Sequence, residues 1–180
     1  MNDNITLIGM PAAGKSTVGV LLAKRLGYSF VDVDLIIQEK EGKRLKEIIS
    51  EKGLDGFLEV ENRINAEVCA SRSVIAPGGS VIYGKEAMEN LSSLGLIVYL
   101  KISYEELLSR LGDVVDRGVA LREGMTLKDL YDERVVYFEK YADITVDEAG
   151  KSLGDVVDEL RTLMEERGYV LGNMGNHQTS

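Results

Sequence analysis

Histidine and cysteine are almost absent from this chain, and their scarcity excludes several kinds of site. The 180 residues contain one cysteine, Cys69, and one histidine, His177. An intramolecular disulfide, a zinc cluster and a histidine-based catalytic triad therefore cannot be assembled. Because Cys69 lies among apolar residues at helical spacing, we expect its thiol to be buried in the core.

Basic residues and long apolar runs are also scarce. Lysine and arginine number 21 against 30 aspartate and glutamate residues, which gives a formal net charge of −9. Surfaces that bind nucleic acids or anionic membranes need clustered cations, so neither partner is expected. No apolar run approaches the length that spans a bilayer, and the N-terminus lacks the pattern of a signal peptide. We expect a cytoplasmic protein that acts on a small molecule as a monomer rather than an oligomer.

The composition is otherwise that of one folded domain. With 180 residues and 44% hydrophobic content, the chain can bury one sizeable core. Strand-like runs alternate with helical patterns, which predicts an α/β fold: a single-domain, three-layer sandwich with a five-stranded parallel sheet and helices on both faces. We expect this domain to span residues 1–167, followed by a flexible tail at 168–180. The strand-like runs are Ile5–Ile8, Ser29–Asp34, Ser73–Ala76, Leu96–Leu100 and Asp143–Val146.

The segment GMPAAGKST, residues 9–17, matches the phosphate-binding pattern G-x-x-x-x-G-K-[ST]. It follows a strand-like run and precedes apolar residues at helical spacing, which is the context that this loop requires. Lys15 would reach the outer phosphates of a nucleoside triphosphate, and Ser16 would offer its hydroxyl to Mg²⁺. The alternative is a glycine-rich turn that contains Lys-Ser by chance. The predicted nucleotide-binding residues are Gly9, Ala12, Ala13, Gly14, Lys15, Ser16 and Thr17.

Two aspartates follow the second strand-like run, at the edge of the sheet where ligands bind. If the strand continues through both, Asp32 and Asp34 point to the same side. Two carboxylates beside a phosphate loop suit Mg²⁺ and an acceptor hydroxyl. The alternative is that Asp34 caps the helix that follows it, which leaves Asp32 unexplained.

Two helical patterns carry a charge on their apolar face. Glu61 lies four residues after Phe57 and three before Ile64, and Arg134 falls in an apolar stripe formed by Leu127, Leu130, Tyr137 and Tyr141. A buried charge needs a partner, so these faces are candidates to line a pocket for an anionic substrate. The alternatives are a structural ion pair, or long side chains that reach water.

The segment from residue 112 to 125 has three glycines and no firm periodicity, which predicts a mobile lid. Arg110 ends the helix before it, and Arg117 lies within it. A mobile segment with arginines near a triphosphate is typical of kinases. For Arg122, an ordinary exposed arginine is the alternative.

Together these residues resemble the shikimate kinase family, small P-loop kinases of the nucleoside-monophosphate-kinase type, over residues 4–165. The resemblance implies an enzyme that uses ATP and Mg²⁺ to transfer the γ-phosphate to a hydroxyl of a small polar metabolite, with shikimate as the first acceptor to consider. The same resemblance implies that Asp32 helps to hold Mg²⁺ and that Asp34 orients or deprotonates the acceptor hydroxyl. It places Arg110 beside adenine and Arg117 on the phosphates, as a catalytic residue with Lys15 and Asp34. The residues it assigns to the acceptor are Asp34, Glu61, Gly78, Gly79 and Arg134, together with position 58.

Three departures from the family pattern fall on the acceptor side. Leu58 stands where the pattern has an arginine that contacts the carboxylic substrate. Pro77 replaces the first of three glycines, and the lid reads RGVA at residues 117–120. We therefore predict a complete ATP site with a weaker hold on shikimate. The alternatives are the same chemistry on a different hydroxylated acid, sugar acid or amino acid, and a non-catalytic ATP-binding regulatory protein.

Overall fold

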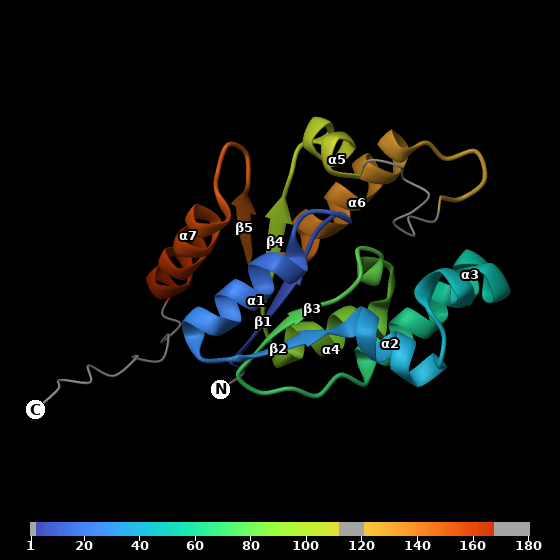
Figure 1. Ribbon diagram of the computed structural model, residues 1–180, viewed down its shortest axis with the longest axis horizontal. Coiled ribbons are helices and arrows are strands. Elements are labelled where there is room, and N and C mark those ends of the chain that lie inside the picture. Colours follow the sequence, from blue (N-terminus) through green and yellow to red (C-terminus); the bar gives the residue numbers. More distant parts are fainter. Residues whose placement is uncertain (1–2, 112–120, 168–180) are drawn as a thin grey trace, which may run out of the picture.

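The computed structural model describes residues 3–111 and 121–167, and Figure 1 shows their arrangement. The predicted tail at 168–180 lies outside the described residues. So does most of the predicted lid, residues 112–120, which includes Arg117. Within the described ranges, no helix is both long enough and apolar enough to cross a membrane.

The strands of the described residues form one parallel sheet in the order β2-β3-β1-β4-β5. The central strand β1 is buried along its whole length, as expected for a parallel strand covered on both faces. Ile5 pairs with Val74 on one side and with Leu96 on the other. The predicted fold class is confirmed. The strands are β1 Asn4–Ile8, β2 Ser29–Asp32, β3 Ser73–Ala76, β4 Gly95–Lys101 and β5 Ile144–Asp147.

Helices cover both faces of this sheet and complete three layers. Helices α1 and α7 contact each other on one face, whereas α4 and α6 pack against β4 on the other (Figure 1). Helix α3 packs along α4 and bends at Gly53, whose φ is +70°. The helices are α1 Lys15–Leu26, α2 Val33–Glu41, α3 Leu45–Ala66, the short 3₁₀ helix η1 Val81–Tyr83, α4 Lys85–Leu94, α5 Tyr104–Leu111, α6 Leu127–Tyr141 and α7 Leu153–Glu166.

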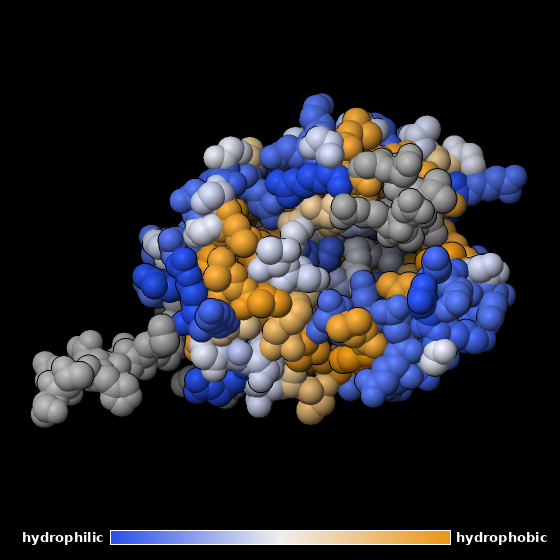
Figure 2. All heavy atoms as spheres, in the orientation of Figure 1, coloured by the Kyte–Doolittle hydropathy of each residue, from blue (hydrophilic) through white to orange (hydrophobic). Residues whose placement is uncertain are grey.

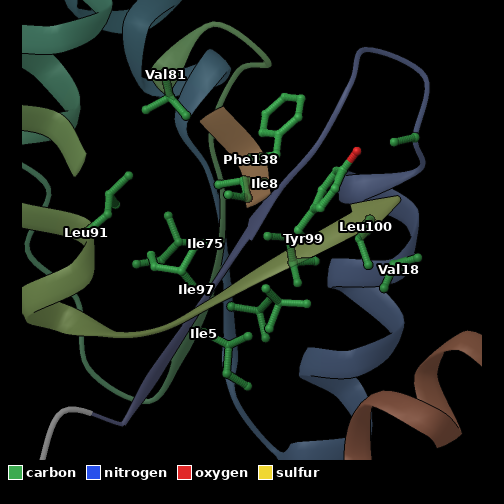
Figure 3. Close-up of a cluster of buried hydrophobic side chains, with 14 of the residues drawn as sticks. Ile5, Ile8, Val18, Ile75, Val81, Leu91, Ile97, Tyr99, Leu100 and Phe138 are labelled. Atoms are coloured by element: carbon green, nitrogen blue, oxygen red, sulfur yellow. The ribbon is translucent and has the colours of Figure 1, made fainter. Parts of the chain in front are cut away.

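The core between these layers also fixes the position of α6 (Figure 3). The ring of Tyr99 on β4 stacks on Phe138 of α6, with 5.0 Å between the ring centroids. The buried residues of α6 are Leu130, Arg134 and Phe138. The predicted stripe holds, because Leu127, Tyr137 and Tyr141 are partly buried against the core beside the buried Leu130 and Arg134, but it misses Phe138. One turn before Phe138, α6 carries Arg134, which lies over the ring of Tyr83.

Two sequence-based expectations are wrong in detail. Strand β2 ends at Asp32, so Asp34 lies in the first turn of α2 and the two side chains are not related by strand alternation. Asp32 is the residue that caps the helix: its Oδ1 accepts hydrogen bonds from the backbone N–H groups of Asp34 and Leu35, at 3.1 and 3.4 Å. Cys69 is exposed rather than buried, because α3 ends at Ala66, so helical spacing no longer applies, and its neighbours Val68 and Ala70 are the residues that pack against the core.

Candidate active site

A cleft lies at the carboxyl ends of β1, β2 and β3, where ligands of open parallel sheets bind. The phosphate loop follows β1, Asp32 ends β2, and the segment Pro77–Ser80 follows β3. Figure 2 shows the molecule hollowed near the middle of this view. The cleft brings together most of the predicted site residues, namely Ala12, Gly14, Lys15, Ser16, Thr17, Asp32, Asp34, Glu61, Gly78, Gly79 and Arg134.

The phosphate loop has the backbone shape of an anion site. Gly14 has a φ of +80°, and Ala12 has a φ of +63°, which is uncommon for a residue with a side chain. A Cβ atom at Gly9 would lie 2.7 Å from the carbonyl oxygen of Leu100, so a larger residue does not fit there. No side chain caps the N-terminus of α1, and its first turn contains no acidic residue. Its N–H groups are therefore available to phosphate oxygens.

The side chain of Lys15 folds back and contacts the backbone of the phosphate loop. Its Nζ donates hydrogen bonds to the carbonyl oxygens of Gly9 and Met10, both at 3.0 Å. Burial lowers the pKa of Lys15 from 10.5 to about 8, although Asp34 opposes this shift. A phosphate group would favour the charged form. Burial is unfavourable for the charged ammonium group, and a bound anion would offset this cost.

Ser16 and Asp32 present oxygen atoms beside the loop. The hydroxyl of Ser16 donates to Oδ2 of Asp32 at 3.4 Å, while Oδ1 of Asp32 caps α2. Mg²⁺ in kinase sites binds one or two protein carboxylates together with substrate phosphates. No group of three or more histidine, cysteine, aspartate or glutamate side chains suited to a metal occurs in the described part of the chain. The hydroxyl and carboxylate here fit a metal that is bound largely by nucleotide.

Asp34 and Glu61 crowd around Gly78. A Cβ atom on Gly78 would lie 2.3 Å from Oε1 of Glu61 and 3.1 Å from Oδ1 of Asp34, so a larger residue there would displace the Glu61 carboxylate. These two carboxylate oxygens are buried and accept no hydrogen bond from the described residues. Burial raises the pKa of Asp34 above its usual value, and the Lys15 charge opposes the shift. Both oxygens are available to accept hydrogen bonds from a ligand.

Glu61 and Arg134 are buried without a direct ion pair. Glu61 is 1% exposed and accepts a hydrogen bond from the Ser80 hydroxyl at 2.6 Å, whereas Arg134 is 5% exposed. The Nε of Arg134 has no hydrogen-bond partner among the described residues. Neither the structural ion pair nor the escape to water is therefore observed. A buried guanidinium with no ion pair among the described residues is suited to bind an anion in the cleft.

Replacing Glu61 by glutamine should change how stability depends on pH. Burial raises the pKa of Glu61 from 4.5 to about 7, so the folded state holds a proton that the unfolded state has released. Relative to Glu61→Gln, the wild-type protein should lose up to about 3 kcal/mol of unfolding free energy as pH rises from its unfolded to its folded pKa. Denaturant unfolding of both proteins across this pH range measures the difference. If the unfolding free energy of wild type instead rose with pH relative to that of Glu61→Gln, the assignment would be wrong.

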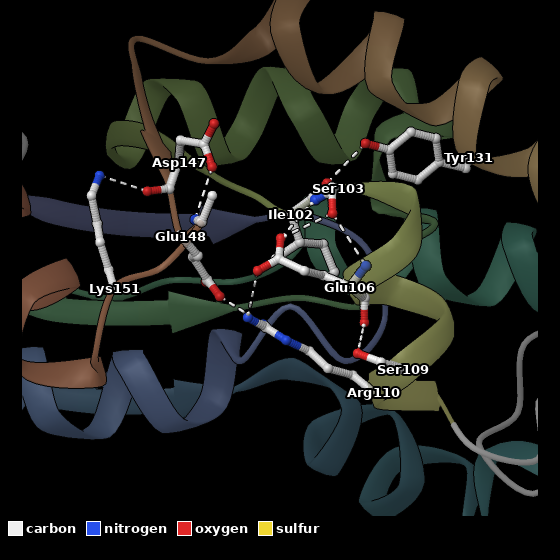
Figure 4. A network of polar contacts seen from close by, with 10 residues as sticks. Ile102, Ser103, Glu106, Ser109, Arg110, Tyr131, Asp147, Glu148 and Lys151 are labelled. Carbon is white, nitrogen blue, oxygen red and sulfur yellow. Dashed lines mark hydrogen bonds and ion pairs between the residues drawn. The ribbon is translucent and has the colours of Figure 1, made fainter.

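Arg110 lies outside the lining of the cleft (Figure 4). Its Nη1 lies 2.7 Å from Oε2 of Glu148, and its Nη2 lies 3.8 Å from Oε1 of Glu106. Burial raises the pKa of Glu148, while Arg110 opposes this shift. Arg110 thus lies on α5, which follows β4, and in the sheet β4 and β5 are on the opposite side of β1 from β2, the strand that precedes Asp34.

Leu58 also does not line the main cleft. It lies in a smaller recess with Tyr83, Arg122 and Leu130, and this recess shares Leu54 and Arg134 with the cleft. The sequence analysis missed Ser80 and Tyr83. The position of Ser80, directly after the two glycines that follow β3, could have indicated it. Nothing in the local pattern indicates Tyr83.

A phosphate loop on the central strand, with two aspartates and a buried arginine around one cleft, defines a P-loop small-molecule kinase. The family model described as shikimate kinase matches residues 11–165. The chain is 34% identical to the shikimate kinase of Persephonella marina over 158 residues, 87% of this chain and 96% of the relative. It is 38% identical to that of Geobacter sulfurreducens over 166 residues, 91% of each chain.

A solved structure gives the same result. The shikimate kinase from Acinetobacter baumannii, in complex with shikimate, matches with a TM-score of 0.84 and 30% identity, covering 92% of this chain and 94% of that one. The chain belongs to the shikimate kinase family. It is an ATP-dependent small-molecule kinase that transfers a phosphoryl group to an alcohol, so the non-catalytic alternative is set aside.

Proposed function

We propose that this enzyme phosphorylates a hydroxyl of a small metabolite that carries a carboxylate, with shikimate as the first candidate. The observation that carries this proposal is Arg134, which is buried in the same cleft as Lys15 and Asp34 and has no ion-pair partner within the described ranges. The relative from Acinetobacter baumannii, which was solved with shikimate, supports this acceptor.

On the nucleotide side, the loop from Gly9 to Thr17 would bind the phosphates of ATP through its backbone N–H groups. Lys15 would stabilise charge on the phosphoryl group during transfer. Arg110 would lie beside the adenine. Arg117 would act on the phosphates from the lid at 112–125, an assignment that rests on the resemblance because this residue lies outside the described ranges.

We assign Mg²⁺ to Ser16 and Asp32, whose Oγ and Oδ2 lie together beside the phosphate loop. When bound, Mg²⁺ neutralises charge that develops on the transferring phosphate. Capping by Oδ1 keeps Asp32 in one orientation, so its second oxygen stays directed at the loop.

On the acceptor side, Asp34 would accept the proton of the reacting hydroxyl. Its Oδ1 has no hydrogen-bond partner among described residues, and burial raises its pKa, which makes it a better base than an exposed aspartate. Gly78 and Gly79 would let the acceptor approach closely, and Glu61 would accept a second hydrogen bond. Arg134 would hold the carboxylate.

A second candidate is the same reaction on a different hydroxylated acid, sugar acid or amino acid. Leu58 favours it, since a cation expected from the family pattern is missing from α3. Pro77 also stands in place of a glycine and removes a backbone N–H from the acceptor side.

We also propose that the enzyme is a cytoplasmic monomer with neither nucleic-acid nor membrane partners. The formal net charge of −9 supports the lack of anionic partners. The exposed thiol of Cys69 supports a reducing compartment.

An assay of ADP release across a panel of hydroxylated metabolites tests the acceptor class. We expect carboxylate-bearing acceptors such as shikimate to be phosphorylated. Arg134→Ala should raise the acceptor KM about ten- to a hundredfold, because it removes a charge-assisted contact, while the ATP KM stays unchanged. Arg161→Ala, on the exposed surface of α7, is the matched control. Preference for an uncharged alcohol, or an Arg134→Ala effect on ATP alone, would refute the proposal.

A further inference from the structure

Two arginines gather around one aromatic ring beside the acceptor end of the cleft. The guanidinium carbons of Arg122 and Arg134 lie 5.3 and 5.5 Å from the centroid of the Tyr83 ring. Tyr83 ends η1, Arg134 lies within α6, and Arg122 precedes α6 in the chain. Three separate segments therefore bring two positive charges to the recess that also contains Leu58.

The charges around this ring do not balance. Nη1 of Arg122 lies 3.3 Å from both carboxylate oxygens of Glu133, and the Tyr83 hydroxyl donates to Glu133 Oε1 at 2.5 Å. Glu133 can neutralise one guanidinium. Arg134 has no ion-pair partner in the described part of the chain, so the pair retains a net positive charge. The other side chains around this recess are the leucines Leu54, Leu58 and Leu130.

Arg122 is held in place rather than freely solvated. Its side chain is 49% exposed and contacts both Glu133 and the face of Tyr83. Its carbonyl oxygen accepts a hydrogen bond from the backbone of Met125 at 3.0 Å, one residue before the Thr126 cap of α6. These contacts fix the guanidinium at the edge of the recess. Arg122 is thus exposed, as the alternative considered from the sequence expects, but it also contacts Tyr83 and Glu133.

We propose that Arg122 is a specificity-determining residue that binds the acceptor carboxylate together with Arg134. This inference rests on the proposed function, because it requires an anionic acceptor. The two guanidinium groups flank Tyr83 next to the cleft that contains Asp34, and the recess and the cleft meet at Arg134 and Leu54. The cation absent from position 58 on α3 is thus supplied by the segment that leads into α6.

A cation swap between Leu58 and Arg122 tests this proposal with shikimate as the probe. Arg122→Gln should raise the shikimate KM at least about tenfold, with kcat and the ATP KM within about twofold of wild type. Leu58→Arg alone should change the KM little, because it adds a third guanidinium to a recess that already has two. In the Arg122→Gln background, Leu58→Arg should lower the shikimate KM again by about tenfold.

Glu133→Gln separates acceptor binding from a structural role of Arg122. Because the amide oxygen of glutamine can still accept hydrogen bonds from Arg122 and Tyr83, this change removes the charge of the ion pair but keeps the Arg122 guanidinium in the recess, so the shikimate KM should stay the same or fall. If Arg122 served only to hold Glu133 and Tyr83, Glu133→Gln would raise the KM as much as Arg122→Gln and lower the melting temperature with it. Arg161→Gln on α7 serves as the control for loss of a surface arginine.

The outcomes distinguish this inference from the proposed function. If wild type phosphorylates shikimate and Arg122→Gln leaves its KM unchanged, the inference is wrong and the proposed function stands. Equal gains from Leu58→Arg with and without Arg122 would also overturn it, as would an Arg122→Gln effect confined to the ATP KM. If wild type neither binds nor phosphorylates shikimate or any other acid of the panel, both the proposed acceptor class and this inference fall.

Discussion

Replacing Lys15 by alanine should lower kcat by at least about a hundred- to a thousandfold, because it removes the ammonium group of the phosphate loop. The hydrogen bonds to the Gly9 and Met10 carbonyls hold this group at the phosphate loop. Coupled measurement of ADP release gives the effect on turnover. Far-ultraviolet circular dichroism and the melting temperature report on the fold.

The free energy of unfolding of Lys15→Ala should not fall although its activity does. Burial lowers the pKa of Lys15 to about 8, so at neutral pH the side chain is still mainly charged and burying that charge costs unfolding free energy. Removing the side chain removes this unfavourable contribution at neutral pH. Lys24→Ala, at the exposed end of α1, is a matched control that should keep full activity. Near-normal turnover by Lys15→Ala with any acceptor would contradict the role given to this loop.

The sheet and the phosphate loop can be predicted from the sequence because each is encoded locally. Parallel strands buried on both faces read as short apolar runs, and four of the five runs match their strands to within one residue at each end. The loop is a continuous motif between a strand and a helix. Glu61 and Arg134 could also be found, since a charge on an apolar helical face is visible in the periodicity.

Details that depend on contacts between distant segments could not be predicted. Whether Glu61 and Arg134 pair depends on how α3 and α6 sit on the sheet, and Ser80 rather than Arg134 bonds to Glu61. The convergence of Arg122 and Arg134 on Tyr83 likewise requires three segments to be placed in space. At Asp32, two local rules compete: strand alternation favours a longer β2, but a capping carboxylate starts α2 earlier.

Because Asp32 caps α2 and Asp34 lies in its first turn, the two aspartates have different expected roles. Substitution of each by asparagine should separate these roles. Asp34→Asn should lower kcat by about a hundred- to ten-thousandfold, because it removes the base nearest the proposed acceptor site. ATP affinity, measured by titration calorimetry, should stay within about twofold, since Asp34 is not assigned to the metal. Burial raises the pKa of Asp34, so wild-type activity should fall on the acidic side as this carboxyl is protonated, and the residual activity of Asp34→Asn should lack that limb.

Asp32→Asn is the matched comparison, because the amide oxygen can still cap α2 while the charge beside Ser16 is lost. The fold should therefore survive, and the main effect should be a higher Mg²⁺ concentration for half-maximal activity. Turnover at saturating Mg²⁺ should recover much more fully in Asp32→Asn than in Asp34→Asn. If both variants weakened ATP binding equally and left kcat intact, the division would be wrong, and both carboxylates would belong to the nucleotide site. Because Oδ1 of Asp34 lies beside Gly78, whereas Oδ2 of Asp32 accepts a hydrogen bond from Ser16, we expect the division to hold.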